Sequence, residues 1–440
     1  MEVTRSVILS REDGEGSPPP RSFAPLRMTG RRWRIATRVA IAIWVLLIVR
    51  LYVTDLWDET VGLVYFGGQV PQTLLSKLHF VMVNPLGFWR PIPTIFCVVM
   101  LHLFTDFDVS FRVLRACSTL FVLISLWLLM RSLRAANEPE DARRDFVATI
   151  AYLFSGSAII TAGWYADIYD AIGLLFVMGG MLLLMRGRDL AAGVVIGIGA
   201  FAKESVALAL PFLLVLWAAG RISFRQMLRA FIPGFLLTIV YFAIRVQIVP
   251  LGSAGDIHAF HARDFVPTLV NLAESFWRQT MVHRDYLGAV GLVITLVALR
   301  RPRLIAAFLL FFVSTAVVYW GMFVSYREDN LVHYLIFVGR LYLIPITLSL
   351  FLLALQRRTL AIALLLVPIV AGAYVTYRDF LRMERTYKQL YKVAAQTKAK
   401  PLRVHFPMKP ITDNVRGIVI GDIPDAPVAI DVKSGRLIYR

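Results

Sequence analysis

The sequence predicts an all-α polytopic membrane protein with about eleven transmembrane helices. Of its 440 residues, 58% are hydrophobic and only 17% are charged, whereas soluble domains average about 45–50% and about 25%. Mean hydropathy is +0.66, and apolar runs recur along most of the chain. The runs are continuous and do not alternate with polar residues, so they predict helices and exclude a membrane β-barrel.

The net charge of +18 predicts a membrane topology and not a nucleic-acid partner, because the arginines stand at the ends of apolar runs and form no single basic face. Every second connection after the first loop is arginine-rich. These connections contain Arg131, Arg134, Arg143 and Arg144; Arg186 and Arg188; Arg221, Arg225 and Arg229; Arg300, Arg301 and Arg303; and Arg357 and Arg358. The positive-inside rule places all of them in the cytoplasm.

Residues 1–35 are polar and basic and are expected to form a flexible cytoplasmic arm. The apolar segment 36–53 then predicts an uncleaved membrane anchor, because a secretory signal would have a shorter basic region and a small-residue cleavage site. The next apolar run, 91–106, is only sixteen residues long and contains Pro91, Pro93, His102 and Asp106. We assign it to a juxtamembrane or re-entrant helix in the first external loop, 54–112, since the arginine-rich loops require an odd number of spans before Arg131.

The other ten spans are expected near apolar runs at 113–133, 146–163, 168–186, 190–202, 204–219, 230–250, 286–300, 304–324, 338–356 and 359–376. Several are shorter than the ~20 residues of a straight span, so tilted helices and helix hairpins are expected. The polytopic domain therefore covers 36–376, with the carboxyl terminus outside.

Residues 377–440 are expected to form a small soluble α+β tail. It begins as an amphipathic helix and continues into short β-like runs at 415–422 and 428–432, separated by proline and glycine. Cys97 and Cys117 both fall in or beside apolar segments, so neither a disulfide framework nor a metal cage is indicated.

This topology brings uncommon polar residues to the outer face. They are Asp58, Glu59, Lys77, Arg90, Asp167, Asp170, Lys203, Glu204, His258, His261, His283, Arg284, Tyr326, Arg327, Glu328, Asp329 and His333. Charged groups near hydrocarbon cost roughly 2.5–3.5 kcal/mol each on insertion scales. A site for a charged lipid headgroup would account for such a gathering.

Structural explanations exist for the same residues. The pair Asp58–Glu59 could cap a helix, and Arg90 could extend to the membrane interface as span-end arginines do. Lys203 and Glu204 could form a local ion pair that closes a hairpin. His258 and His261 are spaced for one helix face, but no third ligand accompanies them, so no metal is indicated.

Four short elements occur in a recognisable order. They are the acidic pair Asp58–Glu59 soon after the first span, Trp89-Arg90-Pro91, Ala202-Lys203-Glu204, and the aromatic-rich stretch from Arg340 to Pro345. Over roughly residues 36–376 this order resembles membrane glycosyltransferases of the GT-C class, specifically the protein O-mannosyltransferase group and its tetratricopeptide-bearing relatives. The chain departs from those relatives in having Asp-Glu where they tend to Asp-Asp, and in lacking a repeat array, which leaves the acceptor open.

The resemblance implies a GT-C-like fold and transfer of a sugar, with inversion, from a polyprenyl-phosphate donor to an acceptor hydroxyl on the outer face. It implies Asp58 as the general base beside Glu59, with Arg90 and Lys203 as partners of the departing phosphate. Further substrate contacts are expected from Glu204, Lys77, Arg327, Arg340 and His258, and no cofactor is expected. The implied setting is a bacterial inner membrane with the site facing the periplasm, a lipid, glycan or protein acceptor, and no nucleic acid.

Two alternatives share these features. A transporter or flippase of a lipid-linked saccharide would also have intramembrane charges and broken short helices. Against it, no inverted repeat is evident and the polar residues gather on one face. An enzyme like an O-antigen ligase or polymerase would use the same kind of lipid-linked donor.

Overall fold

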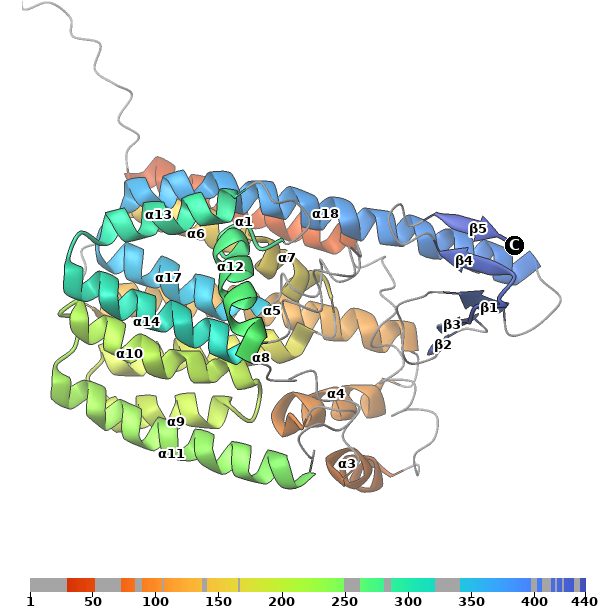
Figure 1. Cartoon of the computed structure of the whole chain (residues 1–440), viewed down its shortest axis with the longest axis horizontal. Coiled ribbons are helices and arrows are strands. Elements are labelled where there is room, and N and C mark those ends of the chain that lie inside the picture. The colour runs from red at the N-terminus through yellow and green to blue at the C-terminus, as the bar shows by residue number, and fades with distance from the viewer. Residues whose placement is uncertain are drawn as a thin grey trace, which may run out of the picture.

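The computed structural model is mostly helical, with a small sheet at its carboxyl end (Figure 1). It describes residues 30–51, 73–83, 89–104, 107–136, 141–164, 167–248, 262–280, 286–320, 341–396, 402–405, 413–415, 418–421, 423–430 and 436–440.

The described helices follow the apolar runs of the sequence closely. Their bounds are α1 Gly30–Leu51, α3 Leu74–Val83, α4 Pro91–Leu103, α5 Phe107–Ala135, α6 Ala142–Leu153, α7 Gly156–Gly163, α8 Ile168–Met185, α9 Asp189–Gly199, α10 Ala209–Ala218, α11 Phe224–Ile248, α12 Phe265–Ser275, α13 Leu287–Leu299, α14 Pro302–Val318, α17 Leu343–Leu355 and α18 Thr359–Gln396. Two 3-10 turns, η2 Glu204–Leu208 and η3 Ala262–Asp264, precede α10 and α12.

Several of these helices have the character of membrane spans. Within the described residues, four are long and apolar enough to cross a membrane, namely Arg112–Ala135 in α5, α8, α11 and α18. Helices α6 and α7 meet at 60° and would together make a fifth, so the predicted run 146–163 is broken. The other apolar helices, such as α9, α13, α14 and α17, are shorter.

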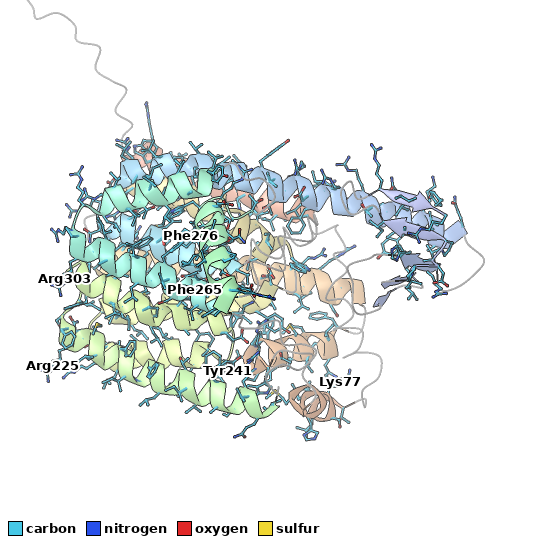
Figure 2. All side chains as sticks on the ribbon, viewed as in Figure 1. Lys77, Arg225, Tyr241, Phe265, Phe276 and Arg303 are labelled. Carbon is cyan, nitrogen blue, oxygen red and sulfur yellow. The ribbon has the colours of Figure 1, made fainter. Side chains whose placement is uncertain are left out.

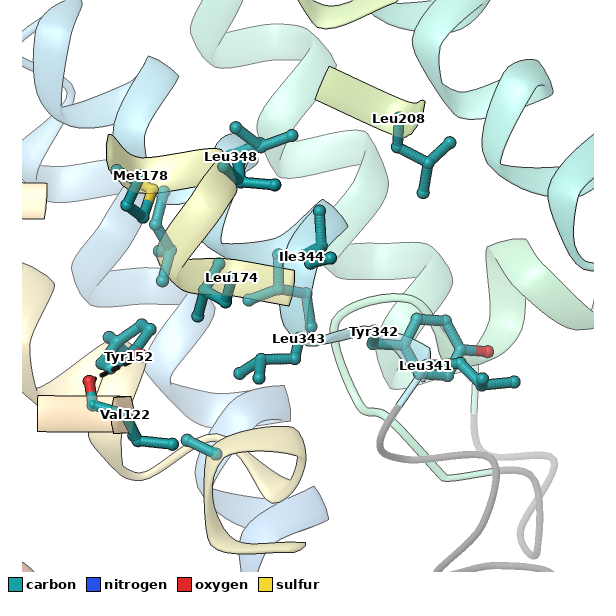
Figure 3. Close-up of a cluster of buried hydrophobic side chains, with 14 of the residues drawn as sticks. Val122, Tyr152, Leu174, Met178, Leu208, Leu341, Tyr342, Leu343, Ile344 and Leu348 are labelled. Atoms are coloured by element: carbon teal, nitrogen blue, oxygen red, sulfur yellow. Dashed lines mark hydrogen bonds between the residues drawn. The ribbon is translucent and has the colours of Figure 1, made fainter. Parts of the chain in front are cut away.

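Helix α17 forms the centre of the bundle. All of its residues, from Leu343 to Leu355, are buried, as expected for a helix that is apolar all round. Leu174 and Met178 of α8 lie beside it (Figure 3). In the same region the Tyr152 hydroxyl donates to the Val122 carbonyl oxygen at 3.0 Å, which satisfies a polar group that is otherwise enclosed by apolar side chains.

The bundle is apolar on its outside as well as in its core. Large hydrophobic side chains are exposed at helical spacing on α11, α13, α14 and α18, including Ile232, Leu236, Ile239, Val290, Val293, Val297, Leu310, Val313, Val317, Leu360, Leu364 and Val367. Water-soluble monomers rarely expose contiguous apolar surface of this extent. The exterior therefore fits a hydrocarbon environment.

Helix α11 packs against α9 with unusually close backbones because both contribute glycines. A Cβ on Gly193 would stand 2.1 Å from the carbonyl oxygen of Ala230, and one on Gly197 would stand 2.6 Å from Leu237. Small residues at such contacts allow membrane helices to approach closely. This contact fixes the position of the last turns of α11 relative to the end of α9.

Arginine-rich helix ends gather at one end of the bundle. The Arg303 guanidinium lies 3.9 Å from the centre of the Trp217 ring, and Arg221 donates to the Leu355 carbonyl oxygen. Figure 2 shows Arg225 and Arg303 at this end, and Tyr241 and Lys77 toward the other. We call the two ends the arginine end and the opposite end.

The carboxyl-terminal sheet follows α18, which runs without interruption across the predicted domain boundary at 376/377. The strands are β1 Leu402–His405, β2 Asp413–Val415, β3 Ile418–Gly421, β4 Val428–Ile430 and β5 Leu437–Tyr439, in the order β2-β3-β1-β4-β5. The central pairs β1–β3 and β1–β4 are parallel, and both outer pairs are antiparallel. The predicted runs 415–422 and 428–432 contain β3 and β4, whereas β1, β5 and most of β2 lie outside them. The expected β structure at the carboxyl end is confirmed as a small sheet.

Candidate functional site

The described residues contain only part of the predicted site. Arg90, Lys203, Glu204 and Lys77 are described, whereas Asp58, Glu59, His258, Arg327 and Arg340 lie outside the described residues. Of the other outer-face candidates, Asp167 and Asp170 are described and buried, and His261, His283, Arg284, Tyr326, Glu328, Asp329 and His333 are outside.

The site is built around the interruption between α9 and η2. The amides of Ala200, Phe201 and Ala202 donate back to the last carbonyls of α9, which ends the helix in tight turns. Lys203 is then extended, with φ −159° and ψ 133°. Because successive side chains of an extended segment point in opposite directions, Lys203 and Glu204 diverge and bind different partners.

Lys203 pairs with Asp170 on α8. The Nζ–Oδ2 distance is 2.8 Å, and both side chains are almost completely buried. Gly173, one turn further along α8, makes room for the lysine, since a Cβ there would be 3.1 Å from the Lys203 Cβ. The local Lys203–Glu204 pair considered from the sequence does not form.

Glu204 pairs with Arg90, which precedes α4 and is 114 residues away in the chain. Arg90 Nε and one terminal nitrogen each lie 2.9 Å from Glu204 Oε2, and the two side chains are 12% and 14% exposed. Arg90 is therefore held in a largely buried ion pair. Its guanidinium also lies 5.6 Å from the centre of the Tyr169 ring.

The two oxygens of the Glu204 carboxylate have different partners. Oε2 accepts a hydrogen bond from Arg90 Nε, and Oε1 lies 2.9 Å from the Tyr241 hydroxyl oxygen. Because Arg90 and Tyr241 occupy its oxygens, Glu204 is suited to hold these groups in place.

Aromatic side chains enclose the ion pair. Trp89 stacks on Tyr241 with ring centres 5.9 Å apart, and Phe201 meets both rings edge-on. The Tyr241 hydroxyl oxygen lies 2.9 Å from both Glu204 Oε1 and the Trp89 carbonyl oxygen, so its proton can be donated to either acceptor. The backbone amide of Ile92 also donates to the Phe201 carbonyl oxygen at 3.4 Å. The start of α4 is thereby attached to the α9–η2 break.

Arg245 also faces Glu204, from the last turns of α11. Its Nε lies 3.8 Å from Glu204 Oε1, and its side chain is 5% exposed. Sequence reasoning missed it because it falls within the apolar run 230–250. The available signal was a charged residue inside that run, four positions after Tyr241 and therefore on the same helix face.

Together, Arg90, Asp170, Lys203, Glu204 and Arg245 form what we call the charged cluster. It lies at the opposite end, since α11 begins at the arginine end and about 30 Å of helix separates Arg225 from Arg245. Arg90 and Lys203, which the sequence analysis selected, both belong to it. Lys77 lies on α3, partly exposed, and no contact described in the structure joins it to the cluster.

The cluster combines positively charged side chains with a low exposure to water, an arrangement suited to binding an anion. Among the described residues, no group of three histidine, cysteine, aspartate or glutamate side chains could hold a metal ion. No family model, no curated protein and no solved structure matches the chain.

Proposed function

We propose that this protein is a membrane glycosyltransferase of the GT-C class. It transfers a sugar, with inversion, from a polyprenyl-phosphate donor to a hydroxyl group of a lipid, glycan or protein acceptor. The reaction takes place on the outer face of the membrane, the periplasmic face of a bacterial inner membrane.

The observation that supports this function best is the buried charged cluster in an otherwise apolar bundle. Arg90 is paired with Glu204, and the adjacent Lys203 is paired with Asp170. Both pairs lie by Tyr241, away from Arg225 and Arg303. A departing phosphate needs cations at a membrane-accessible depth, whereas a purely structural bundle has no need of buried charges that cost free energy.

The proposed topology has eleven spans. These are α1, α5, the α6–α7 pair, α8, α9, η2 with α10, α11, α13, α14, α17 and α18. The exposed apolar faces of the short helices α13 and α14 support their inclusion, as tilt and local bilayer thinning accommodate short spans. With the arginine end in the cytoplasm, the charged cluster faces outward.

The chemistry assigns one carboxylate to the acceptor and cations to the donor. Asp58 removes the proton from the acceptor hydroxyl as that oxygen attacks the anomeric carbon. The bond from this carbon to the phosphate oxygen breaks, and the phosphate leaves as an anion stabilised by Arg90 and Lys203. No general acid is required. Glu59, Lys77, Glu204, His258, Arg327 and Arg340 are assigned to substrate contacts or to the positioning of the site.

A transporter of a lipid-linked saccharide is the second candidate. The interruption between α9 and η2, with charged residues beside it, favours this function, because transporters bind ligands at such broken helices. The two functions differ in their products. A transferase cleaves the sugar–phosphate bond, and a transporter moves its ligand unchanged.

Incubation of the purified full-length protein with a panel of polyprenyl-phosphate sugars tests the proposal. Mass spectrometry should detect free polyprenyl phosphate together with a glycosylated acceptor or, without an acceptor, slow hydrolysis. If every donor remains intact while proteoliposomes move it across the bilayer, the protein is a transporter. If neither occurs with any donor, both functions are rejected.

A further inference from the structure

Two arginines share the Glu204 carboxylate within the described part of the charged cluster. Among the described residues, Glu204 is in contact with the guanidinium groups of both Arg90 and Arg245, and the Lys203–Asp170 pair is neutral by itself. The contacts thus join two positive charges to one carboxylate, in a region where all three side chains are at most 14% exposed. A buried charge without a counter-charge is unfavourable.

The contacts are unequal, and Arg245 is the arginine in excess. Arg90 places two nitrogens 2.9 Å from Oε2 of Glu204, and the Tyr241 hydroxyl lies 2.9 Å from Oε1. Arg245 Nε is 3.8 Å from Oε1, too far for a hydrogen bond. This buried Nε has no hydrogen-bond partner among the described residues.

The position of Arg245 is suited to a ligand. It stands four residues after Tyr241 on the same face of α11, three residues before the end of that helix. The α9–α11 glycine contacts hold this face against the α9–η2 break. The planar guanidinium has five N–H donors and favours bidentate pairing with phosphate oxygens.

We propose that Arg245 binds the phosphate group of the ligand, and that the phosphate accepts the hydrogen bond that Arg245 Nε does not make to Glu204. The choice of phosphate as the anion rests on the proposed function. Arg245 makes this contact in addition to those assigned to Arg90 and Lys203, and Arg90 keeps its two nitrogens on Glu204. The guanidinium groups of Arg90 and Arg245 would then face two anions, Glu204 and the phosphate.

Ligand-induced stabilisation measures this directly, without any need for sugar transfer. The full-length protein in detergent is unfolded by heat with polyprenyl phosphate, with the uncharged polyprenol of equal length, and with inorganic phosphate. Wild type is expected to bind polyprenyl phosphate at least tenfold more tightly than polyprenol. Arg245→Gln should weaken binding of polyprenyl phosphate about 10- to 100-fold. Arg245→Lys should recover part of the loss, because it restores the charge but not the bidentate geometry.

Arg225→Gln is the matched control, since it removes the same charge from an exposed position at the other end of α11. It should bind polyprenyl phosphate as wild type does. Ligand-free Arg245→Gln should unfold at the same temperature as wild type or higher, because it removes an excess buried charge. Stabilisation by inorganic phosphate as strong as that by the lipid, and lost in Arg245→Gln, would support the phosphate site with free phosphate as its ligand.

Three results would overturn the inference: no stabilisation of wild type by either phosphate compound, unchanged binding in Arg245→Gln, or a marked fall in the unfolding temperature of ligand-free Arg245→Gln. The last would show that Arg245 is a structural partner of Glu204. If Arg245-dependent binding is found but no donor is ever cleaved, the proposed function fails and the phosphate site remains. If sugar transfer is found but Arg245→Gln binds polyprenyl phosphate as wild type does, the proposed function remains and the phosphate site at Arg245 fails.

Discussion

The carboxylate of Glu204 connects segments that are far apart in the sequence. It receives Arg90 from the start of α4, Tyr241 from α11 and the more distant Arg245. The separations of 114 and 37 residues mean that the pairing depends on how helices α4, α9 and α11 pack. Glu204 is therefore a structural centre of the cluster as well as part of the candidate site.

Replacement of Glu204 by Gln should destabilise the protein by about 3–5 kcal/mol, because it removes one partner of a largely buried ion pair. Thermal unfolding in detergent measures the loss. Asp425→Asn provides the control, as it breaks the exposed pair with Arg403 and should cost less than about 1 kcal/mol. Equal losses in the two variants would show that the Arg90–Glu204 contact contributes no more than a surface pair.

Asp58→Asn should slow sugar transfer about 10²–10⁴-fold, which is the usual effect of removing a general base. The amide keeps the size of the carboxylate, so folding and donor binding should stay near normal. Glu59→Gln should have a smaller effect, since adjacent side chains point in different directions and only one can reach the acceptor proton. Transfer by Asp58→Asn at the wild-type rate, or inactivity confined to Glu59→Gln, would refute the assignment.

At the scale of the elements, hydrophobic patterning was sufficient to predict most helices. The apolar run 190–202 corresponds to α9, Asp189–Gly199, and the run 286–300 corresponds to α13, Leu287–Leu299. The bend between α6 and α7 and the continuation of α18 past residue 376 were not predicted. The bend lies at Ser155, whose side chain caps the start of α7 through a local hydrogen bond. Helix α18 continues past residue 376 because no helix-breaking residue separates its apolar part from its amphipathic part.

The partners within the candidate site were harder to predict than its location. Residue type and topology led to Arg90 and Lys203, and both lie in the charged cluster. Their pairing with Glu204 and Asp170 could not be read from the sequence, since it depends on one extended residue and on helix packing. Arg245 was missed because its apolar neighbours dominate the pattern of its run. Binding of one phosphate by Arg90 and Lys203 stays a prediction.

The α9–α11 contact supplies a prediction at this scale. Gly193→Ala should destabilise the protein by about 1–3 kcal/mol, because the added methyl group would stand 2.1 Å from the Ala230 carbonyl oxygen and force the helices apart. Gly179→Ala is the control, since its Cβ would meet only Val195 at 3.9 Å. It should be neutral or slightly stabilising. Unfolding measurements that rank the variants in the reverse order would contradict this account of the contact.

At the scale of the whole molecule, charge is divided between two ends. Arg221, Arg225 and Arg303 lie at the arginine end, and the charged cluster lies at the other. The positive-inside rule relates the first end to the cytoplasm. The amino terminus should then be cytoplasmic, with the loops 54–112, 251–285 and 325–337 outside.

Single-cysteine labelling of intact cells tests this topology, in a background with Cys97 and Cys117 replaced by serine. Ser253→Cys should react with a membrane-impermeant reagent from outside, because it lies in the loop 251–285. Ser223→Cys, at the start of α11, should be protected until the membrane is opened. The reverse pattern would invert the topology and place the charged cluster in the cytoplasm.

The sidedness of sugar transfer tests the central claim most directly. Proteoliposomes whose orientation is known from the Ser253 and Ser223 labels are supplied with the polyprenyl-phosphate donor, and a membrane-impermeant acceptor is added on one side at a time. Glycosylated acceptor should form only when the acceptor is on the side of the charged cluster. Product formed only on the side of the arginine end, or on neither side with any donor, would contradict the account.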